Sequence, residues 1–176
     1  MAVAQQLYEG LPLGTEGPVG LITYMRTDSM QVAASAVAEA KAYIKDTFGT
    51  AYVATRQPPR KKAKGAQEAH EAIRPTSVLR QPETLRPHLS ADQLRLYELI
   101  WRRFVASQMA AAVIATTSVV IRADAADEAY RLRASHSRIE FDGFYAVAGA
   151  PDDDASRLPL PPLASGEALD LIAIRP

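Results

Sequence analysis

Two stretches in the first third of the chain carry apolar residues at helical spacing. The first covers residues 2–9 and is followed by Gly10, which can end a helix. The second covers residues 30–48; it follows Ser29, a favourable N-cap residue, and is followed by Gly49. The apolar side of this second helix consists of Val32, Ala33, Ala36, Val37, Ala40, Ile44 and Phe48.

A third helical pattern begins with a capping-box pair. Ser90 and Gln93 are spaced so that each side chain can bond the backbone N–H of the other residue. The helix continues to about Ala112. Its inner side consists of Leu94, Tyr97, Ile100, Trp101, Phe104, Val105 and Gln108. An aromatic stripe of this kind is most simply explained as core packing.

Strand-like patterns follow the third helix. Branched residues dominate residues 116–121, and polar and apolar residues alternate over 130–137. The pattern continues over 138–147 through the pair Asp142-Gly143, which is typical of a tight turn between strands.

The order of these elements indicates the fold class. A last short strand is expected at residues 168–174, and no internal repeat is visible. Because the helices precede most of the strands, the sequence predicts an α+β fold with a domain boundary near Ala111.

One strand is expected early in the chain, at residues 19–26. Side chains alternate between the two faces of a strand, so Tyr24 and Arg26 would point the same way. The helix expected at residues 30–48 would begin a few residues later, and the backbone N–H groups of a helix N-terminus favour anions. One phenol and one fixed positive charge on one face are the minimum needed to attack a phosphodiester.

Composition limits the possibilities only in part. The 176 residues include no cysteine, which excludes disulfides and thiolate metal sites. No apolar run of about eighteen residues occurs, and the N-terminus lacks the order of charges and apolar residues of a signal peptide. We therefore expect a soluble, cytoplasmic protein. The formal net charge is zero, which leaves a nucleic-acid partner open, because the placement of charges decides binding.

Positive charge is concentrated in one segment. Residues 56–80 contain seven lysines and arginines against Glu68 and Glu71. A basic run of this kind is most often a solvated loop. A compact polar motif follows at once, and this favours phosphate binding, with Lys61 and Lys62 as candidate contacts.

The polar motif covers residues 67–76. It is expected to form one or two helical turns that end before Pro75, since a residue preceding proline avoids helical dihedral angles. His70 and Arg74 are four positions apart and would share a helix face, and the two glutamates of the segment suggest an ion pair with a nearby arginine or lysine. A lone histidine is more often structural than catalytic. Three widely spaced histidines without cysteine argue against zinc.

Three sequence blocks resemble the type IA DNA topoisomerases of bacteria. They are GLITYMRTDS at residues 20–29, QEAHEAIRPT at 67–76 and LYELIWRRFVASQM at 96–109. Their order and spacing also match those of the family. The first two blocks are far more specific than an isolated Tyr-x-Arg, and the similarity weakens after about Gly149.

The resemblance implies roles for five residues. Tyr24 corresponds to the nucleophile that forms a 5′-phosphotyrosine link, and Arg26 to the residue that binds the scissile phosphate. His70 matches a histidine near the active site that binds DNA or assists the chemistry. Asp28 matches a polar neighbour of the site, and Arg74 matches an arginine with a structural or DNA-contacting role.

The resemblance also implies domains and partners. Residues 1–110 would form most of a helical, winged-helix or CAP-like tyrosine domain, and residues 111–176 part of a β-rich arch domain. Single-stranded and negatively supercoiled DNA are the expected partners, without a membrane, and the expected location is the cytoplasmic nucleoid. The reaction would be ATP-independent, and the sequence has no GxxxxGK[ST] phosphate loop.

Part of the family's machinery is expected outside this chain. In the family, a TOPRIM domain supplies a glutamate, a lysine and an acidic cluster that holds Mg²⁺, and no DxDxE pattern occurs here. We therefore expect this fragment to bind no metal, and the TOPRIM, gate and C-terminal DNA-binding domains to lie elsewhere in the protein. The earlier arch strands would also be missing, so the C-terminal strands should expose unpaired edges or pair among themselves.

Two other interpretations remain open. The chain could be a DNA-binding module without independent turnover, in which the helices and the basic loop hold a DNA backbone. It could also be a structural helix-and-sheet scaffold in which Tyr24 is a packed or hydrogen-bonded tyrosine.

Overall fold

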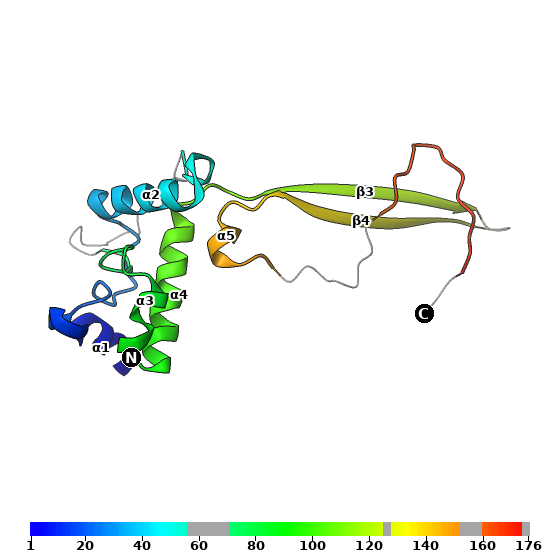
Figure 1. Cartoon of the computed structure of the whole chain (residues 1–176). Coiled ribbons are helices and arrows are strands. Elements are labelled where there is room, and N and C mark those ends of the chain that lie inside the picture. The colour runs from blue at the N-terminus through cyan, green and yellow to red at the C-terminus, as the bar shows by residue number, and fades with distance from the viewer. Residues whose placement is uncertain (56–70, 125–127, 152–159, 174–176) are drawn as a thin grey trace. The chain divides into compact units, whose positions relative to one another are not determined.

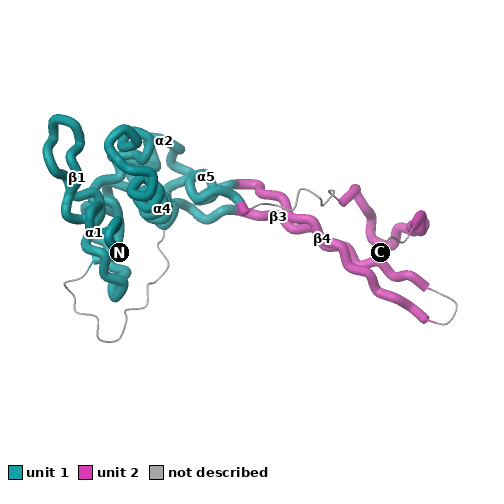
Figure 2. The backbone as a smooth tube through the Cα atoms, turned by 90° about the horizontal axis from the view of Figure 1, so that it is seen from below, with its two compact units in different colours: residues 1–112, 142–150 teal, residues 113–141, 151–176 magenta. Residues whose placement is uncertain are grey.

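The computed structural model describes residues 1–55, 71–124, 128–151 and 160–173. The chain divides into two compact units (Figure 2). One contains Met1–Ala112 and Asp142–Ala150, and the other contains Val113–Phe141 and Pro151–Pro176. Helices dominate the first unit and a pair of long strands the second, which confirms the predicted α+β class.

The first unit is mainly helical (Figure 1). Its elements are α1 (Ala2–Glu9), β1 (Leu11–Pro12), η1 (Gly14–Glu16), β2 (Pro18–Val19), α2 (Ala34–Phe48), η2 (Thr50–Tyr52), α3 (Pro82–Leu85), η3 (Arg86–His88), α4 (Ala91–Ser107) and α5 (Tyr145–Ala148). The short strands β1 and β2 pair antiparallel.

The predicted helices are confirmed, with changes at their ends. Helix α1 has the predicted bounds, and the capping box of Ser90 and Gln93 is formed at the start of α4. Helix α4 ends at Ser107, earlier than expected. Helix α2 begins at Ala34, and Ser29 does not cap it. The Ser29 hydroxyl instead accepts a local hydrogen bond from the Gln31 N–H at 3.2 Å, so the chain stays non-helical there.

Aromatic residues of α4 form the centre of the core, as predicted. Tyr97 is fully buried, and its hydroxyl donates to the Arg80 carbonyl at 2.7 Å. The Trp101 indole N–H donates to the Val78 carbonyl at 2.9 Å, and its ring meets that of Tyr43 edge to face. Desolvation by burial raises the pKa of Tyr97, so this phenol remains protonated and can keep donating its hydrogen bond.

The early strand is much shorter than predicted. Only Pro18–Val19 belongs to a strand, and Ile22 forms an isolated antiparallel bridge with Pro75. At Gly20 the chain passes close beside α1: a Cβ atom there would be 2.7 Å from the Tyr8 carbonyl oxygen. The Leu21 N–H then donates to the Leu7 carbonyl at 2.7 Å. A regular strand through residue 26 was therefore a wrong prediction.

The helical turn predicted before Pro75 is also wrong over residues 71–74. Residues 71–74 are not helical, and residues 67–70 lie outside the described part of the chain. The backbone of this segment pairs with the segment before Tyr24 instead: Thr23 N–H donates to the Arg74 carbonyl at 2.9 Å, and Thr76 N–H to the Leu21 carbonyl at 2.9 Å. Tertiary pairing has replaced the local helical bonds.

The second unit contains β3 (Val113–Asp124) and β4 (Ala129–Phe141), paired antiparallel (Figure 1). Strand β3 includes the predicted strand 116–121 and extends it at both ends. Strand β4 joins residues that the sequence assigned to two successive strands. No strand occurs at residues 168–173, where the last short strand was expected.

The pair Asp142-Gly143 does not join two strands, contrary to the prediction. It leads from β4 into the short helix α5, and the segment Asp142–Ala150 belongs to the first unit. The Tyr52 hydroxyl donates to Asp142 at 2.7 Å. Gly143 has a φ of 51°, and a Cβ atom there would lie 2.6 Å from the Ala110 carbonyl oxygen. These contacts with the helical unit fix the turn.

We expect the substitution Tyr97→Phe to lower the free energy of unfolding by about 1–2 kcal/mol, because it leaves the partly buried Arg80 carbonyl without its hydroxyl donor. Urea denaturation would measure this change. The matched control is Tyr130→Phe, which removes an exposed hydroxyl bonded to Glu128 and should change stability by less than about 0.5 kcal/mol. Equal effects of the two substitutions would contradict the assigned role of Tyr97.

We also expect the isolated chain to associate through its hairpin. Among the described residues, the sheet contains β3 and β4 alone, so each strand has one edge without a strand partner. In light scattering, Leu132→Lys on β4 should reduce concentration-dependent association, whereas Leu99→Lys on α4 should not; the two side chains are 54% and 55% exposed. A sharp monomeric profile of the unmodified chain, with full protection of the strand amides in hydrogen exchange, would contradict this expectation.

Candidate active site around Tyr24

Tyr24 lies in an irregular loop that follows the bridge at Ile22. Its side chain is 50% exposed. The Arg26 N–H donates to the Tyr24 carbonyl at 2.9 Å, a bond two residues apart that makes a tight turn. The Tyr24 ring packs edge to face against Tyr8 of α1, with ring centroids 5.1 Å apart. One side of the ring is therefore supported, while half of the side chain remains open to solvent.

Arg26 lies beside this tyrosine although the predicted strand is absent. Its guanidinium carbon is 5.7 Å from the centre of the Tyr24 ring, within the range of a cation–π contact, and the side chain is exposed. The tight turn, rather than strand alternation, brings the two side chains together. The prediction that the Tyr24 phenol and the Arg26 guanidinium lie side by side is confirmed. The prediction that a strand places them there is wrong.

The loop that carries Tyr24 is attached at its start to residues 72–74. The Thr23 hydroxyl donates to the Ala72 carbonyl at 2.8 Å and accepts from the Arg74 N–H at 2.9 Å. The Thr23 N–H also donates to the Arg74 carbonyl at 2.9 Å. Three hydrogen bonds therefore fix the residue immediately before the tyrosine.

Glu71 and Arg74 form the predicted type of ion pair. Arg74 Nε lies 2.7 Å from one carboxylate oxygen of Glu71, and Nη2 lies 3.1 Å from the other, so the contact is bidentate. Desolvation opposes ionisation of Glu71. The hydrogen bonds from the Arg74 side chain and from the Ala33 N–H outweigh it and hold the pKa of Glu71 below its usual value.

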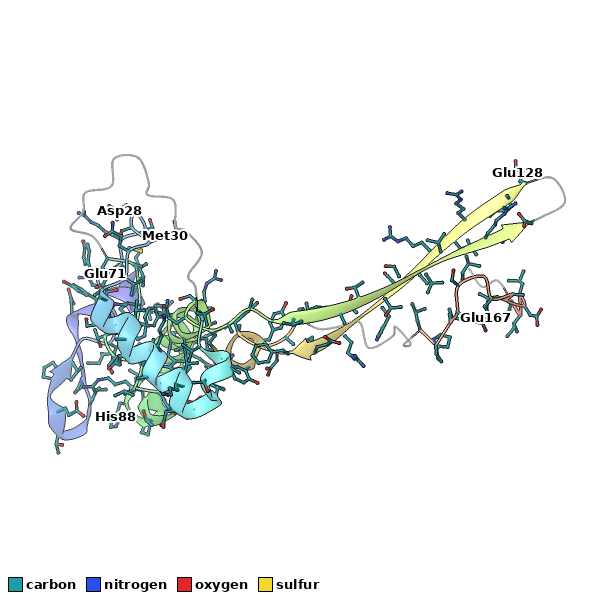
Figure 3. The ribbon with its side chains drawn as sticks, turned by 90° about the horizontal axis from the view of Figure 1, so that it is seen from above. Asp28, Met30, Glu71, His88, Glu128 and Glu167 are labelled. Atoms are coloured by element: carbon teal, nitrogen blue, oxygen red, sulfur yellow. The ribbon has the colours of Figure 1, made fainter. Side chains whose placement is uncertain are left out.

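The other predicted site residues differ in position. Asp28 is exposed on the same loop as Tyr24, and Figure 3 shows Asp28, Met30 and Glu71 grouped at one end of the first unit. Arg74 is turned inward against Glu71, with its side chain 12% exposed. His70, Lys61 and Lys62 lie outside the described residues.

Two residues near the site were not predicted from the sequence. Tyr8 supports the ring of Tyr24, and Thr23 fixes the start of its loop. The partners of Thr23 are about fifty positions away in the chain, so no local pattern indicates its role. The contact of Tyr8 depends on the close approach of α1 at Gly20, which is likewise a tertiary feature.

The described residues show neither a metal-binding cluster nor a membrane-spanning helix. No group of three or more His, Cys, Asp or Glu side chains there could hold a metal ion. The same part of the chain has no helix that is both long and apolar enough to cross a membrane.

Comparison with known proteins places the chain in a family. The family model for DNA topoisomerase matches residues 1–175. The solved structure of full-length topoisomerase I from Thermotoga maritima is similar at 38% sequence identity with a TM-score of 0.74. The match covers 92% of this chain and 25% of the Thermotoga protein, so the chain spans about a quarter of that relative. The chain belongs to the DNA topoisomerase family, and the resemblance to the bacterial type IA enzymes is confirmed.

Proposed function

We propose that this chain supplies the tyrosine part of a DNA-cleaving site. The whole protein would relax negatively supercoiled DNA by cutting one strand, passing another through the break and resealing it. The observation that carries the proposal is the half-exposed Tyr24 with the guanidinium of Arg26 beside its ring, in a chain of the DNA topoisomerase family.

The proposed reaction exchanges one phosphodiester for another. The phenolic oxygen of Tyr24 attacks phosphorus, an oxygen–phosphorus bond forms, and the bond from phosphorus to the 3′-oxygen of the preceding nucleotide breaks. The phenol loses its proton, and the departing 3′-oxygen gains one. The products are a 5′-phosphotyrosine and a free 3′-hydroxyl. Because the number of phosphate ester bonds is unchanged, the reverse attack reseals the strand without ATP.

Arg26 is proposed to bind the scissile phosphate. A guanidinium is charged throughout the physiological pH range and binds phosphate oxygens through a planar fork. It offsets the negative charge that develops on the oxygens around phosphorus during attack. Exposed placement beside Tyr24 supports this role, since a phosphate at the phenol would lie near the guanidinium.

The remaining predicted contacts are part of the same proposal. His70 would bind DNA or assist the chemistry, Lys61 and Lys62 would contact DNA, and Asp28 would be a polar neighbour of the site at the DNA. The resemblance implies Mg²⁺ bound by a TOPRIM domain. The described residues do not form a cluster that fits Mg²⁺, and the steps above involve only Tyr24 and Arg26 of this chain. A DNA substrate implies action at the nucleoid.

A DNA-binding module without independent turnover is the second candidate. It would use the same exposed guanidinium of Arg26 to bind a backbone phosphate without a covalent step. The scaffold interpretation needs a packed or hydrogen-bonded Tyr24, and the 50% exposure of that side chain argues against the packed form.

We expect the chain to form a covalent adduct with single-stranded DNA when a TOPRIM domain of the family and Mg²⁺ are supplied. Attachment through a 5′-phosphate keeps a 3′-end label on the protein and releases a 5′-end label on a shortened oligonucleotide. Denaturing gels of oligonucleotides labelled at either end would measure this. Tyr24→Phe should abolish the adduct, because it removes the attacking oxygen.

The matched control is Tyr8→Phe, because this ring contacts Tyr24 and is itself 39% exposed. It should still form the adduct. If Tyr8→Phe lost the adduct and Tyr24→Phe kept it, Tyr8 rather than Tyr24 would be the nucleophile, and the proposal would be wrong. Absence of any adduct in the unmodified chain, together with salt-sensitive DNA binding, would favour the binding module.

Arg26→Ala should slow cleavage by about 100-fold or more while weakening DNA binding much less, since the guanidinium acts mainly on the charge that develops in the transition state. Single-turnover cleavage and a binding titration under the same conditions would separate the two effects. Arg95→Ala, at an exposed arginine of α4, is the control and should leave the cleavage rate unchanged. Equal losses of rate and affinity in Arg26→Ala would make Arg26 a simple phosphate contact.

A further inference from the structure

Residues 71–74 hold both ends of the loop 24–30. At the start of the loop, Thr23 is bound to Ala72 and Arg74 by the three hydrogen bonds described above. At its end, the Ala72 N–H donates to the Gln31 carbonyl at 2.7 Å. The Ala33 N–H donates to Glu71 Oε1, also at 2.7 Å. We call residues 71–74 the clasp.

Glu71 replaces a missing cap of helix α2. The N-cap residue of α2 is Ala33, which has no side chain able to accept a hydrogen bond. In a capping box, a Glu or Gln three residues into the helix accepts from the N-cap N–H. Here the same N–H is bound by a carboxylate 38 positions away. The start of α2, and with it the end of the loop 24–30, therefore depends on Glu71.

Arg74 fixes the carboxylate of Glu71. Two of its nitrogens bind the two carboxylate oxygens, and Nη1 donates to the Pro75 carbonyl at 2.8 Å. The guanidinium is thus directed toward its own segment, with little of its side chain exposed. A bidentate pair held in this way restricts Glu71 to one orientation, which a lone exposed carboxylate would not keep.

We propose that Glu71 and Arg74 are positioning residues of the Tyr24 site. The inference rests on the proposed function. Half of the Tyr24 side chain is exposed, and its described ring contacts are Tyr8 and Arg26, so the position of the phenol depends strongly on its loop. The clasp holds both ends of that loop by hydrogen bonds of its backbone, and its ion pair orients the carboxylate that binds the Ala33 N–H. Loosening it displaces the phenol from the phosphate without removing any group that touches DNA.

This role differs from a direct DNA contact by Arg74, which the sequence left open. A phosphate contact would be partly replaced by lysine, which keeps the charge. The clasp needs the planar fork of arginine, because Nε and Nη2 bind different oxygens of Glu71. Substitution by lysine therefore separates the two roles.

The first experiment needs neither DNA nor chemistry. Hydrogen exchange is followed at the amides of Ala33 and Ala72 in the full chain and in Glu71→Ala. We expect exchange at both amides to be at least about tenfold faster in the variant, because the loop end is released. Glu98→Ala, which breaks the exposed ion pair with Arg102 on α4, is the control and should leave both amides unchanged. Unchanged exchange in Glu71→Ala would overturn the clasp.

The second experiment measures single-turnover cleavage and DNA binding with the TOPRIM domain and Mg²⁺ supplied. In Glu71→Ala, Arg74→Ala and Arg74→Lys, cleavage should fall about 10- to 100-fold, the size expected for a small displacement of a reacting group, with affinity within about twofold. The double variant Glu71→Ala/Arg74→Ala should be no slower than Glu71→Ala alone, because the two residues act as one unit.

The outcomes separate this inference from the proposed function. Faster exchange with unchanged cleavage would overturn the positioning role. Normal cleavage in Arg74→Lys, with lost affinity in Arg74→Ala, would make Arg74 a DNA contact. If the unmodified chain forms no adduct at all, the proposed function fails and positioning for catalysis fails with it. The exchange result then decides only whether the clasp holds the loop.

Discussion

Two hydrogen bonds donated by side chains of α4, one buried and one partly buried, hold the segment on which the candidate site depends. Tyr97 and Trp101 donate to the backbone carbonyls of Arg80 and Val78, in a stretch without regular helix or strand. Carbonyl groups in such a stretch have no ladder partner, so burial would be costly without these donors. The aromatic side chains therefore do more than fill the core: they fix a non-regular segment against it.

Further contacts lead from this anchor to Tyr24. Glu39 of α2 accepts hydrogen bonds from the Ser77 hydroxyl and the Val78 N–H, which ties the same segment to a second helix. The segment continues into the clasp, whose backbone pairs with the residues before the tyrosine. An exposed side chain on an irregular loop is thus connected to the helical core through a short series of hydrogen bonds. This arrangement leaves the phenol open to a substrate while its backbone is held.

Local signals in the sequence predicted the helices well and the site geometry poorly. The capping box at Ser90 was predictable because its two partners are three positions apart. The start of α2 was not, because the group that binds its N-cap N–H comes from Glu71. Likewise, Tyr24 and Arg26 were expected together on a strand face, yet a tight turn brings them together. The turn between strands predicted at Asp142-Gly143 was wrong for the same reason, since contacts with Tyr52 and Ala110 decide the conformation there.

A match to a family motif does not show which role each residue of the motif has. The blocks around Tyr24 and around Arg74 identified the family together, and by resemblance alone both could be assigned to DNA. Their contacts separate them. Tyr24 and Arg26 are exposed side chains beside each other, whereas the guanidinium of Arg74 binds Glu71 and the carbonyl of Pro75. A cation already bound to a carboxylate and a carbonyl would have to give up those partners to bind a phosphate. Breaking a bidentate, partly buried ion pair is costly, which favours leaving it intact, so residues 71–74 hold the loop that carries Tyr24.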